Sequence, residues 1–242
     1  MDNDLTNGRK GSDKLAKLLD ELREVAVETN KQYAKKLGIN QSAAITCVKP
    51  SGTVSQLVDA ASGIHARHSD FYVRTVRADN KDPLCQFMKD KGFPHEACVM
   101  KPDHVTVFSF PIHSPNSSVK RDEMTAIEQL DHWLIYQRHW CEHKPSITVT
   151  VREDEWMEVG AWVYKHFDEV SGVSFLPHSD HVYKQAPYQE CDKKAYKELL
   201  DKMPTDIDWT ELKTYEETDN TVGSQTMACS GNSCEIVDIT NT

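Results

Sequence analysis

The sequence lacks a long apolar run, since no stretch approaches the 18 or so apolar residues that a membrane span requires. Its opening, MDNDLTNGRKGSD, also lacks the apolar middle of a secretory signal. These absences argue against a membrane protein and predict a cytoplasmic one. Apolar residues make up 38% and charged residues 27% of the 242 residues, which is the composition of a chain that can bury a core without covalent staples.

The chain has fewer basic than acidic residues, namely 28 Lys and Arg against 38 Asp and Glu, which gives a formal net charge of -10. Binding to phosphate backbones needs clustered Lys and Arg that release counterions, so we expect no direct contact with nucleic acid. A small anionic ligand is still compatible with this charge, because a few local donors are enough to hold it.

Metal-site spacings are missing as well. The seven cysteines are odd in number, and no paired C-x-x-C groups or C-x-x-C with a histidine pair occur, so neither a disulfide framework nor structural zinc is predicted. Two histidine pairs have helical spacing, His65 with His68 and His139 with His143. No H-E-x-x-H motif accompanies them, and we interpret them as solvated or hydrogen-bonded side chains.

Apolar periodicity predicts alternating helices and strands. Helices are expected over 12–37, 54–61, 82–92, 122–141, 153–170 and 189–202, and strands over 42–48, 71–78, 96–100, 104–110, 146–151 and 173–177. This alternation favours an α/β fold with a largely parallel sheet. Four tryptophans, at 133, 140, 156 and 162, are expected in the core.

The domain prediction has three parts. Residues 1–11 are read as a disordered leader, residues 12–212 as one body without a linker, and residues 213–242 as a mobile tail that is poor in large apolar side chains.

The stretch CVKPSGTVSQL carries the first candidate site. A strand that enters a helix through a tight turn leaves the first helical N–H groups without partners, and these attract an anion. Gly52 allows close approach to the backbone, and Ser51 and Thr53 add hydroxyl donors. The candidate phosphate-binding residues are Pro50, Ser51, Gly52, Thr53 and Val54. The alternative is an ordinary helix start that Ser51 or Thr53 caps.

The second candidate is Cys229 with Cys234, separated by Ser-Gly-Asn-Ser. This spacer is small and polar, so the chain can fold back and bring two sulfurs together. On a mobile tail such a dithiol can exchange electrons by thiolate attack on another disulfide. The alternative is a pair of unremarkable exposed thiols.

Several separated motifs, in order, resemble adenosylcobalamin-dependent ribonucleotide reductases, in particular the monomeric ribonucleoside-triphosphate reductases. They are SAAITCVKPSGTVSQLVDAASGIHARHS, YVRTVRADNKDPL, KPSITVTVREDEW, SGVSFLP and the tail pair CSGNSC. The resemblance covers most of residues 15–234 and suggests the carboxyl-terminal portion of such an enzyme.

The resemblance implies a fold, a cofactor and partners. The fold would be the second half of a ten-stranded α/β barrel, and the complete enzyme would use adenosylcobalamin. The turn at residues 50–54 would hold the phosphates of a ribonucleoside triphosphate. Cys229 and Cys234 would re-reduce an active-site disulfide and be recharged by thioredoxin or a similar reductant. No cobalt ligand is implied in the protein.

One family element is missing. The radical-forming cysteine and its carboxylate lie in the family on a loop with an Asn-Pro-Cys-x-Glu motif, and no cysteine of this chain has Glu two residues later. Cys47 adjoins the turn but is expected to be a small buried strand residue. We therefore expect the isolated chain to be inactive and to need a polypeptide that carries the amino-terminal barrel half. The alternative is a non-catalytic nucleotide-binding or assembly module derived from such a reductase.

Overall fold

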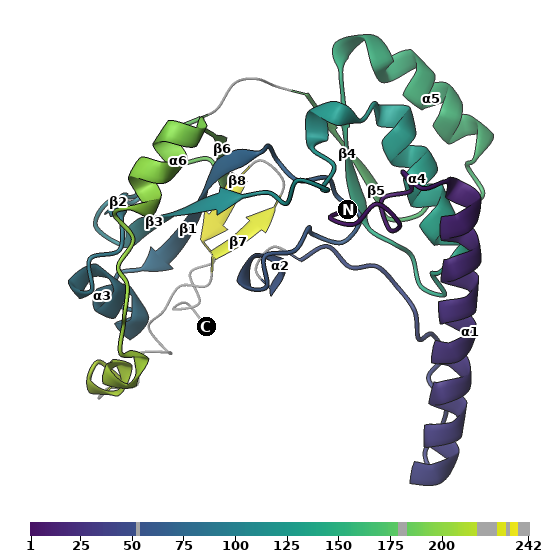
Figure 1. Ribbon diagram of the computed structural model, residues 1–242, viewed down its shortest axis with the longest axis horizontal. Helices are drawn as coiled ribbons and strands as arrows, with labels where there is room; N and C mark the ends of the chain where they lie inside the picture. The colour runs from purple at the N-terminus through teal and green to yellow at the C-terminus, as the bar shows by residue number, and fades with distance from the viewer. Residues whose placement is uncertain (52–53, 179–182, 217–226, 231–232, 237–242) are drawn as a thin grey trace. The chain divides into compact units, whose positions relative to one another are not determined.

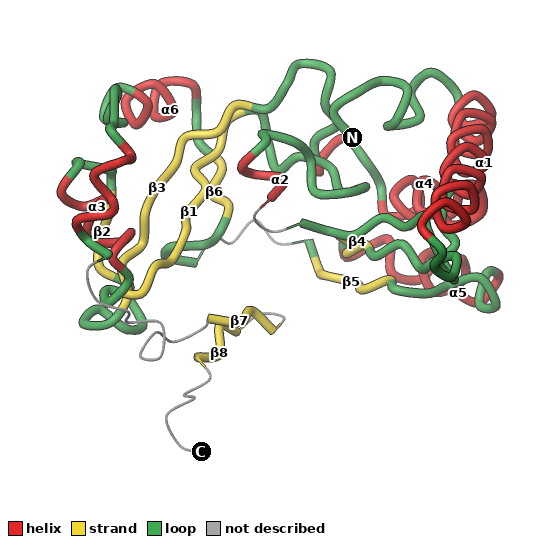
Figure 2. Tube along the Cα trace, turned by 90° about the horizontal axis from the view of Figure 1, so that it is seen from below, coloured by secondary structure: helices red, strands yellow, loops and turns green. Residues whose placement is uncertain are grey.

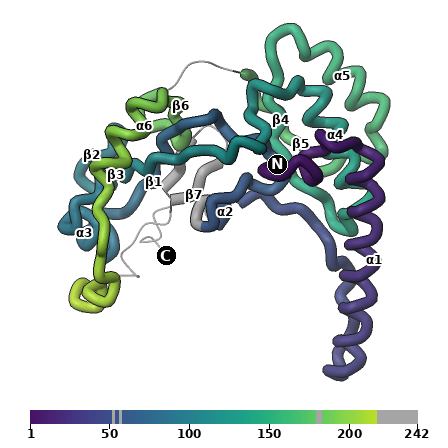
Figure 3. The backbone as a smooth tube through the Cα atoms, in the orientation of Figure 1, coloured from purple at the N-terminus to yellow at the C-terminus, as the bar shows by residue number. Residues whose placement is uncertain are grey.

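The computed structural model describes residues 1–51, 54–178, 183–216, 227–230 and 233–236. Its contacts divide the chain into two compact units, Met1–Asp70 with Ser114–Asp180 and Phe71–His113 with His181–Thr242. Each unit is thus built from two separate stretches of chain, which the colours of Figure 3 distinguish. The sequence predicts no boundary within 12–212, because no change of composition marks the positions where the chain passes between the units.

The first unit is built on a parallel pair of strands, β4 (Ile147–Val151) and β5 (Val173–Pro177), joined through helix α5 (Trp156–Lys165) (Figure 1). Both strands and the parallel pairing agree with the sequence prediction. The unit also contains α1 (Ser12–Leu37), α2 (Val54–Leu57), η1 (Arg121–Glu123), α4 (Ala126–His139) and η2 (Glu153–Glu155). Among the described residues, no helix has the length and apolar character of a membrane span.

The core of this unit lies between the strand pair and its helices. Ile147, Val149 and Val151 alternate along β4 and pack in one cluster with Trp133 of α4 and Trp162 of α5. Burying one such side chain stabilises the fold by about 1.5–3 kcal/mol. The Trp133 indole N–H, fully buried, donates to the Pro145 carbonyl at 3.0 Å. Trp156 was expected in the core but is 40% exposed.

Residues 1–11 form a series of turns, whereas the sequence predicted a disordered leader. Met1 and Asn7 are buried, and the carboxylate of Asp2 binds the Arg67 guanidinium through contacts of 2.9 and 2.8 Å. Burial raises the pKa of Asp2, but its hydrogen bonds to Arg67 and its attraction to that charge outweigh this effect and hold the pKa below its ordinary value. Arg67 itself is only 3% exposed and also binds Asp59. A buried guanidinium therefore ties the first residues to the unit.

The predicted strand at 42–48 is not formed, because its backbone groups find other partners. The Glu142 carboxylate accepts the N–H groups of Ile45 and Thr46, and the Thr46 carbonyl accepts the N–H groups of residues 142 and 143. Cys47, expected to be buried there, is exposed. The Glu142 side chain and the backbone of residues 142 and 143 therefore hold this segment, and they take the place of a neighbouring strand.

The second unit contains a four-stranded sheet in the order β2-β3-β1-β6 (Figure 2). Its elements are β1 (Phe71–Asp79), α3 (Pro83–Asp90), β2 (His95–Ala97), β3 (Val105–His113), β6 (Tyr188–Glu190), α6 (Lys193–Leu200), η3 (Trp209–Thr214), β7 (Met227–Ser230) and β8 (Ser233–Ile236). The hairpin predicted at 96–110 is confirmed as the β2–β3 pair.

The expectation of a largely parallel sheet is wrong for this unit. Strand β3 is antiparallel to both of its neighbours, β1 and β2. Through helix α3 the chain passes from β1 to β2, and these two strands are parallel, as the alternating pattern predicts. Strand β3 then lies between them and runs in the opposite direction. Mixed α/β structure is confirmed, while the described strands form small sheets in place of a ten-stranded barrel.

The carboxyl-terminal part also begins differently from the prediction. The helix expected over 189–202 begins only at Lys193, where Asp192 caps it by accepting the Ala195 N–H at 2.7 Å. The preceding residues, 188–190, pair with β1. Of the predicted mobile tail, residues 217–226, 231–232 and 237–242 lie outside the described residues.

Gly172 at the start of β5 gives a test of the strand pair. Its φ is +62°, and an added Cβ would lie 2.9 Å from the Pro145 carbonyl oxygen. We expect Gly172→Ala to destabilise the protein by about 1–3 kcal/mol, because it adds both backbone strain and a clash. Urea denaturation measures this change. Gly160→Ala, in open space on α5, should instead be neutral or stabilise by up to about 1 kcal/mol.

Candidate functional site

The predicted phosphate turn lies partly within the described residues. Gly52 and Thr53 lie outside them, while Pro50 and Val54 are exposed. The Ser51 N–H donates to the Ser62 hydroxyl at 2.8 Å, and the Ser51 hydroxyl accepts the Ser55 N–H at 2.9 Å. Ser51 thus caps the four-residue helix α2, as the alternative interpretation of this turn expected. Its amide and its hydroxyl are both engaged within the chain.

The loop after α2 returns to the turn at a glycine. Gly63 has φ +59°, and an added Cβ would lie 3.1 Å from both the Lys49 carbonyl oxygen and a Val48 methyl group. Only a residue without a side chain allows this approach at that φ. Gly63 therefore allows Ser62 to approach the turn. It belongs to the SGIHARHS end of the first motif on which the family resemblance rests.

His65 connects this loop to strand β4. Its Nδ1 lies 2.7 Å from the Ser62 carbonyl oxygen, and its Nε2 lies 2.9 Å from the Thr148 N–H that donates to it. Both contacts are satisfied only by the neutral ring with the proton on Nδ1. Burial lowers the pKa of His65, which favours that neutral form. The expectation of a hydrogen-bonded histidine is confirmed here.

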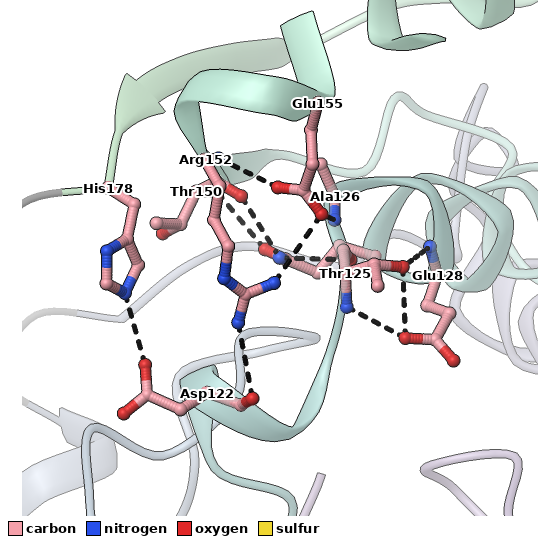
Figure 4. Close-up of polar contacts among 9 residues, drawn as sticks. Asp122, Thr125, Ala126, Glu128, Thr150, Arg152, Glu155 and His178 are labelled. Atoms are coloured by element: carbon pink, nitrogen blue, oxygen red, sulfur yellow. Dashed lines mark hydrogen bonds and ion pairs between the residues drawn. The ribbon is translucent and has the colours of Figure 1, made fainter.

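A polar cluster follows the carboxyl ends of the two parallel strands (Figure 4). Arg152 comes directly after β4, and His178 comes directly after β5. The His178 Nε2 lies 3.2 Å from a carboxylate oxygen of Asp122, and the Arg152 guanidinium donates to the Asp122 carbonyl at 3.3 Å. The short η1 turn is thereby held against both strand ends.

Glu155 is the second acid of this cluster. Its carboxylate accepts the backbone N–H groups of Arg152 at 2.7 Å and of Ala126 at 3.0 Å, and it pairs with the Arg152 side chain at 3.5 Å. Burial raises the pKa of Glu155, but these donors and the Arg152 charge outweigh it, so the pKa lies below its ordinary value. Glu155 is therefore a fixed acceptor that orients the start of α4.

The cluster was not among the residues predicted from sequence. In open α/β sheets, ligands bind beyond the carboxyl ends of parallel strands, and this rule applied to 146–151 and 173–177 would have pointed to Arg152 and His178. Both acids of the cluster are engaged by neighbours within the unit, so the cluster holds η1 and the start of α4 against the strand ends.

The cysteines divide by environment. Cys229 and Cys234 are directly opposite in the antiparallel register of β7 and β8, and their side chains lie outside the described residues. Burial raises the pKa of Cys141 to about 11, so it is a neutral thiol at pH 7. Among the described residues, no group of three or more His, Cys, Asp or Glu has the geometry of a metal site.

Comparison with known proteins gives one consistent result, although no protein-family model matches the chain. It is 30% identical over 211 residues to the adenosylcobalamin-dependent ribonucleoside-triphosphate reductase of Euglena gracilis. It is 31% identical over 228 residues to a probable enzyme of that name from Dictyostelium discoideum, and 28% identical over 236 residues to one from Lactobacillus delbrueckii subsp. bulgaricus. These matches cover 86%, 91% and 91% of this chain. The resemblance predicted from the motifs is confirmed.

The fold of this chain is also similar to that of a solved structure. A crystal structure of a B12-dependent (class II) ribonucleotide reductase superimposes on 86% of this chain with a TM-score of 0.70, at 24% identity. The chain spans about three tenths of the length of the relatives it matches, namely 29%, 28% and 30% of the three enzymes and 29% of the crystallised chain.

Buried histidines predict how stability depends on pH. Burial lowers the pKa of His68 and of His132 to about 4 each, from an ordinary value near 6.5. Between these values the unfolded chain binds protons that the folded chain does not, so stability is fully present above pH 6.5 and falls as the pH drops toward 4. We expect His132→Leu to reduce this dependence by about 1.4 kcal/mol per pH unit. Urea midpoints between pH 4.5 and 7.5 measure it, and the exposed His104→Gln should leave the slope unchanged.

Proposed function

We propose that this chain, similar over most of its length to adenosylcobalamin-dependent ribonucleoside-triphosphate reductases, is the carboxyl-terminal part of such an enzyme. In that role it takes part in the reduction of ribonucleoside triphosphates to deoxyribonucleotides. The observation that carries the proposal is the joint match of sequence and fold to these enzymes over about nine tenths of the chain. The complete fold would be the ten-stranded barrel, of which this chain contributes the second half.

The turn at residues 50–54 would bind the substrate phosphates. Because the Ser51 amide donates to Ser62, we assign the phosphate contact to the backbone N–H groups of Gly52, Thr53 and Val54 and to the hydroxyls of Ser51 and Thr53. The Ser51 hydroxyl oxygen accepts the Ser55 N–H and keeps its own proton to donate. Pro50 and Ser51 would fix the shape of the turn. The neutral His65 ring also holds this loop, because its Nδ1–H donates to the Ser62 carbonyl.

Cys229 and Cys234 would form the electron relay. Directly opposite residues in an antiparallel ladder have Cα atoms about 4.5–5.5 Å apart, within the range that a disulfide accepts. One thiolate would attack the active-site disulfide, and the second would release the mixed disulfide, so that two electrons and two protons reach the active-site cysteines. The tail disulfide would then be reduced by thioredoxin or a similar dithiol.

Adenosylcobalamin would belong to the complete enzyme. In the family it supplies the radical chemistry that begins the reaction. The family resemblance implies no protein ligand to cobalt in this chain. The radical-forming Asn-Pro-Cys-x-Glu loop would come from a second polypeptide that carries the amino-terminal barrel half.

A second candidate is a non-catalytic nucleotide-binding or assembly module. The missing Asn-Pro-Cys-x-Glu motif favours it. The two candidates separate when the chain is mixed with the second polypeptide, a ribonucleoside triphosphate, adenosylcobalamin and a small dithiol. Formation of deoxynucleotide supports the reductase, whereas nucleotide binding without turnover supports the module.

The tail relay is tested by the double substitution Cys229→Ser and Cys234→Ser in that reconstituted mixture. Turnover with a small dithiol should be retained, because the small molecule reaches the active-site disulfide directly, while turnover with thioredoxin should be lost. Deoxynucleotide formation is measured with each reductant. Cys191→Ser is the matched control, and equal loss with both reductants would contradict the relay.

The phosphate turn is tested by Gly52→Ala. A Cβ at this position should hinder the approach of a triphosphate to the backbone and raise the KM by about tenfold, since each 1.4 kcal/mol of lost binding is tenfold. The KM for a ribonucleoside triphosphate is compared with that of Gly160→Ala, which lies on α5. An unchanged KM in Gly52→Ala would remove the turn from the substrate site.

A further inference from the structure

Cys47 and Cys141 are two cysteines of the first unit to which the proposed function gives no role. Cys47 lies in the segment that leads into the candidate turn, and Cys141 lies two residues after the end of α4. Although these positions are far apart in the sequence, the structure holds the two segments side by side.

Hydrogen bonds fix the peptide groups on both sides of Cys47. The Thr46 carbonyl, which belongs to the peptide group before Cys47, accepts the Glu142 N–H at 2.9 Å. The Cys47 carbonyl, which belongs to the peptide group after it, accepts the Trp140 indole N–H at 3.1 Å. The two neighbours of Cys141 in sequence thus bind the two peptide groups that flank Cys47.

The Cys141 sulfur lies against the same backbone. The N–H of the peptide group that joins Cys47 to Val48 bonds to this sulfur. An amide nitrogen is only two covalent bonds, about 2.4 Å, from the preceding Cα atom. Segments that share backbone hydrogen bonds bring facing Cα atoms to about 4.5–5.5 Å, and a disulfide accepts Cα distances up to about 7 Å. The Cys141 sulfur is therefore placed for a bond to Cys47.

The two thiols differ in how easily they react. Cys47 is exposed, whereas Cys141 is half-buried. Burial, with a smaller contribution from Cys47, raises the pKa of Cys141 to about 11, although the Val48 N–H and the Arg23 charge act in the opposite direction. A small oxidant in solution therefore reaches Cys47 first, and Cys141 is the adjacent thiol that can react next.

We propose that Cys47 and Cys141 form a reversible disulfide when the chain meets a small-molecule disulfide such as oxidised glutathione. The Cys47 thiolate attacks one glutathione sulfur, the S–S bond of the oxidant breaks, and one reduced glutathione leaves. The Cys141 thiol then loses its proton and attacks the Cys47 sulfur, which releases the second glutathione. Two protein thiols become one disulfide, and one oxidised glutathione becomes two reduced molecules.

This modification site goes beyond the proposed function, because it needs neither the tail pair nor the second polypeptide. The bond joins the segment that enters residues 50–54 to the loop after α4. The redox state of the surrounding thiols thereby acts on the backbone that leads into the candidate turn.

Peptide mapping of the full chain tests the pair. The reduced chain is incubated with oxidised glutathione near pH 8, digested without reductant and analysed by mass spectrometry. We expect a transient glutathione adduct at Cys47, followed by a peptide pair linked through Cys47 and Cys141 that a small dithiol separates again. A persistent adduct at Cys47 without this link, or a Cys47 bond to another chain, would overturn the proposal.

Single substitutions separate the two steps. Cys141→Ser should stop the reaction at the Cys47 adduct, and Cys47→Ser should leave Cys141 unmodified, since that thiol is half-buried and neutral. Trp140→Phe removes the indole N–H that holds the Cys47 carbonyl and should slow only the second step, by about fivefold, the effect of one hydrogen bond.

The matched control is Cys191→Ser, another half-buried cysteine, which should react as the parent does. Circular dichroism checks the fold of each variant, and the parent chain alone decides the outcome if a variant does not fold. A Cys47 disulfide that persists in Cys141→Ser, or one that is lost in Cys191→Ser, contradicts the assignment.

The pH dependence of the second step identifies the attacking thiol. Because the pKa of Cys141 is about 11, its thiolate fraction, and with it the rate of disulfide closure, should rise about tenfold per pH unit between pH 7 and 9. The glutathione adduct removes the charge of Cys47, but burial remains the main cause of the raised pKa. A rate that levels off near pH 8.5, as for an ordinary thiol, would exclude Cys141 as the attacking group.

Discussion

Every backbone N–H and carbonyl group that folding removes from water needs a partner, and this requirement shapes both units of the chain. Strand β4 meets it on one side with β5 and on the other with the side chains of His65 and Gln129. The same His65 holds the Ser62 carbonyl, and Ser62 holds the amide of Ser51. The candidate phosphate turn is thus connected to the central strand by a chain of hydrogen bonds, of which the one from the Thr148 N–H to Nε2 requires a neutral imidazole.

Local patterns predicted the elements well where short-range interactions determine them. The bounds of α1 follow from its apolar spacing and from Gly38, whose left-handed φ of 68° ends the helix. The elements β4, α5 and β5 follow from two runs of β-branched residues and from the helical pattern between them. The strand prediction at 42–48 was wrong because the hydrogen-bond partner of this segment is the Glu142 carboxylate, about 100 positions away. No local pattern contains that information.

The candidate site was predictable to a similar degree. The motif at 50–54 identified the turn, yet the bond from the Ser51 N–H to Ser62 depends on how the loop returns at Gly63, which lies outside that motif. Arg152 and His178 were missed because each looks like an ordinary charged residue in sequence. Only the parallel pairing of the strands before them brings both to Asp122.

The covered outer edge of β4 restricts which strands can pair with this chain. If both edges of the parallel pair were open, strands could add on either side, and copies of the chain could extend into a continuous sheet. Because Gln129 makes both hydrogen bonds of Thr150, addition on that side would require displacing an internal partner at no gain. Strand addition beside Thr150 is therefore disfavoured.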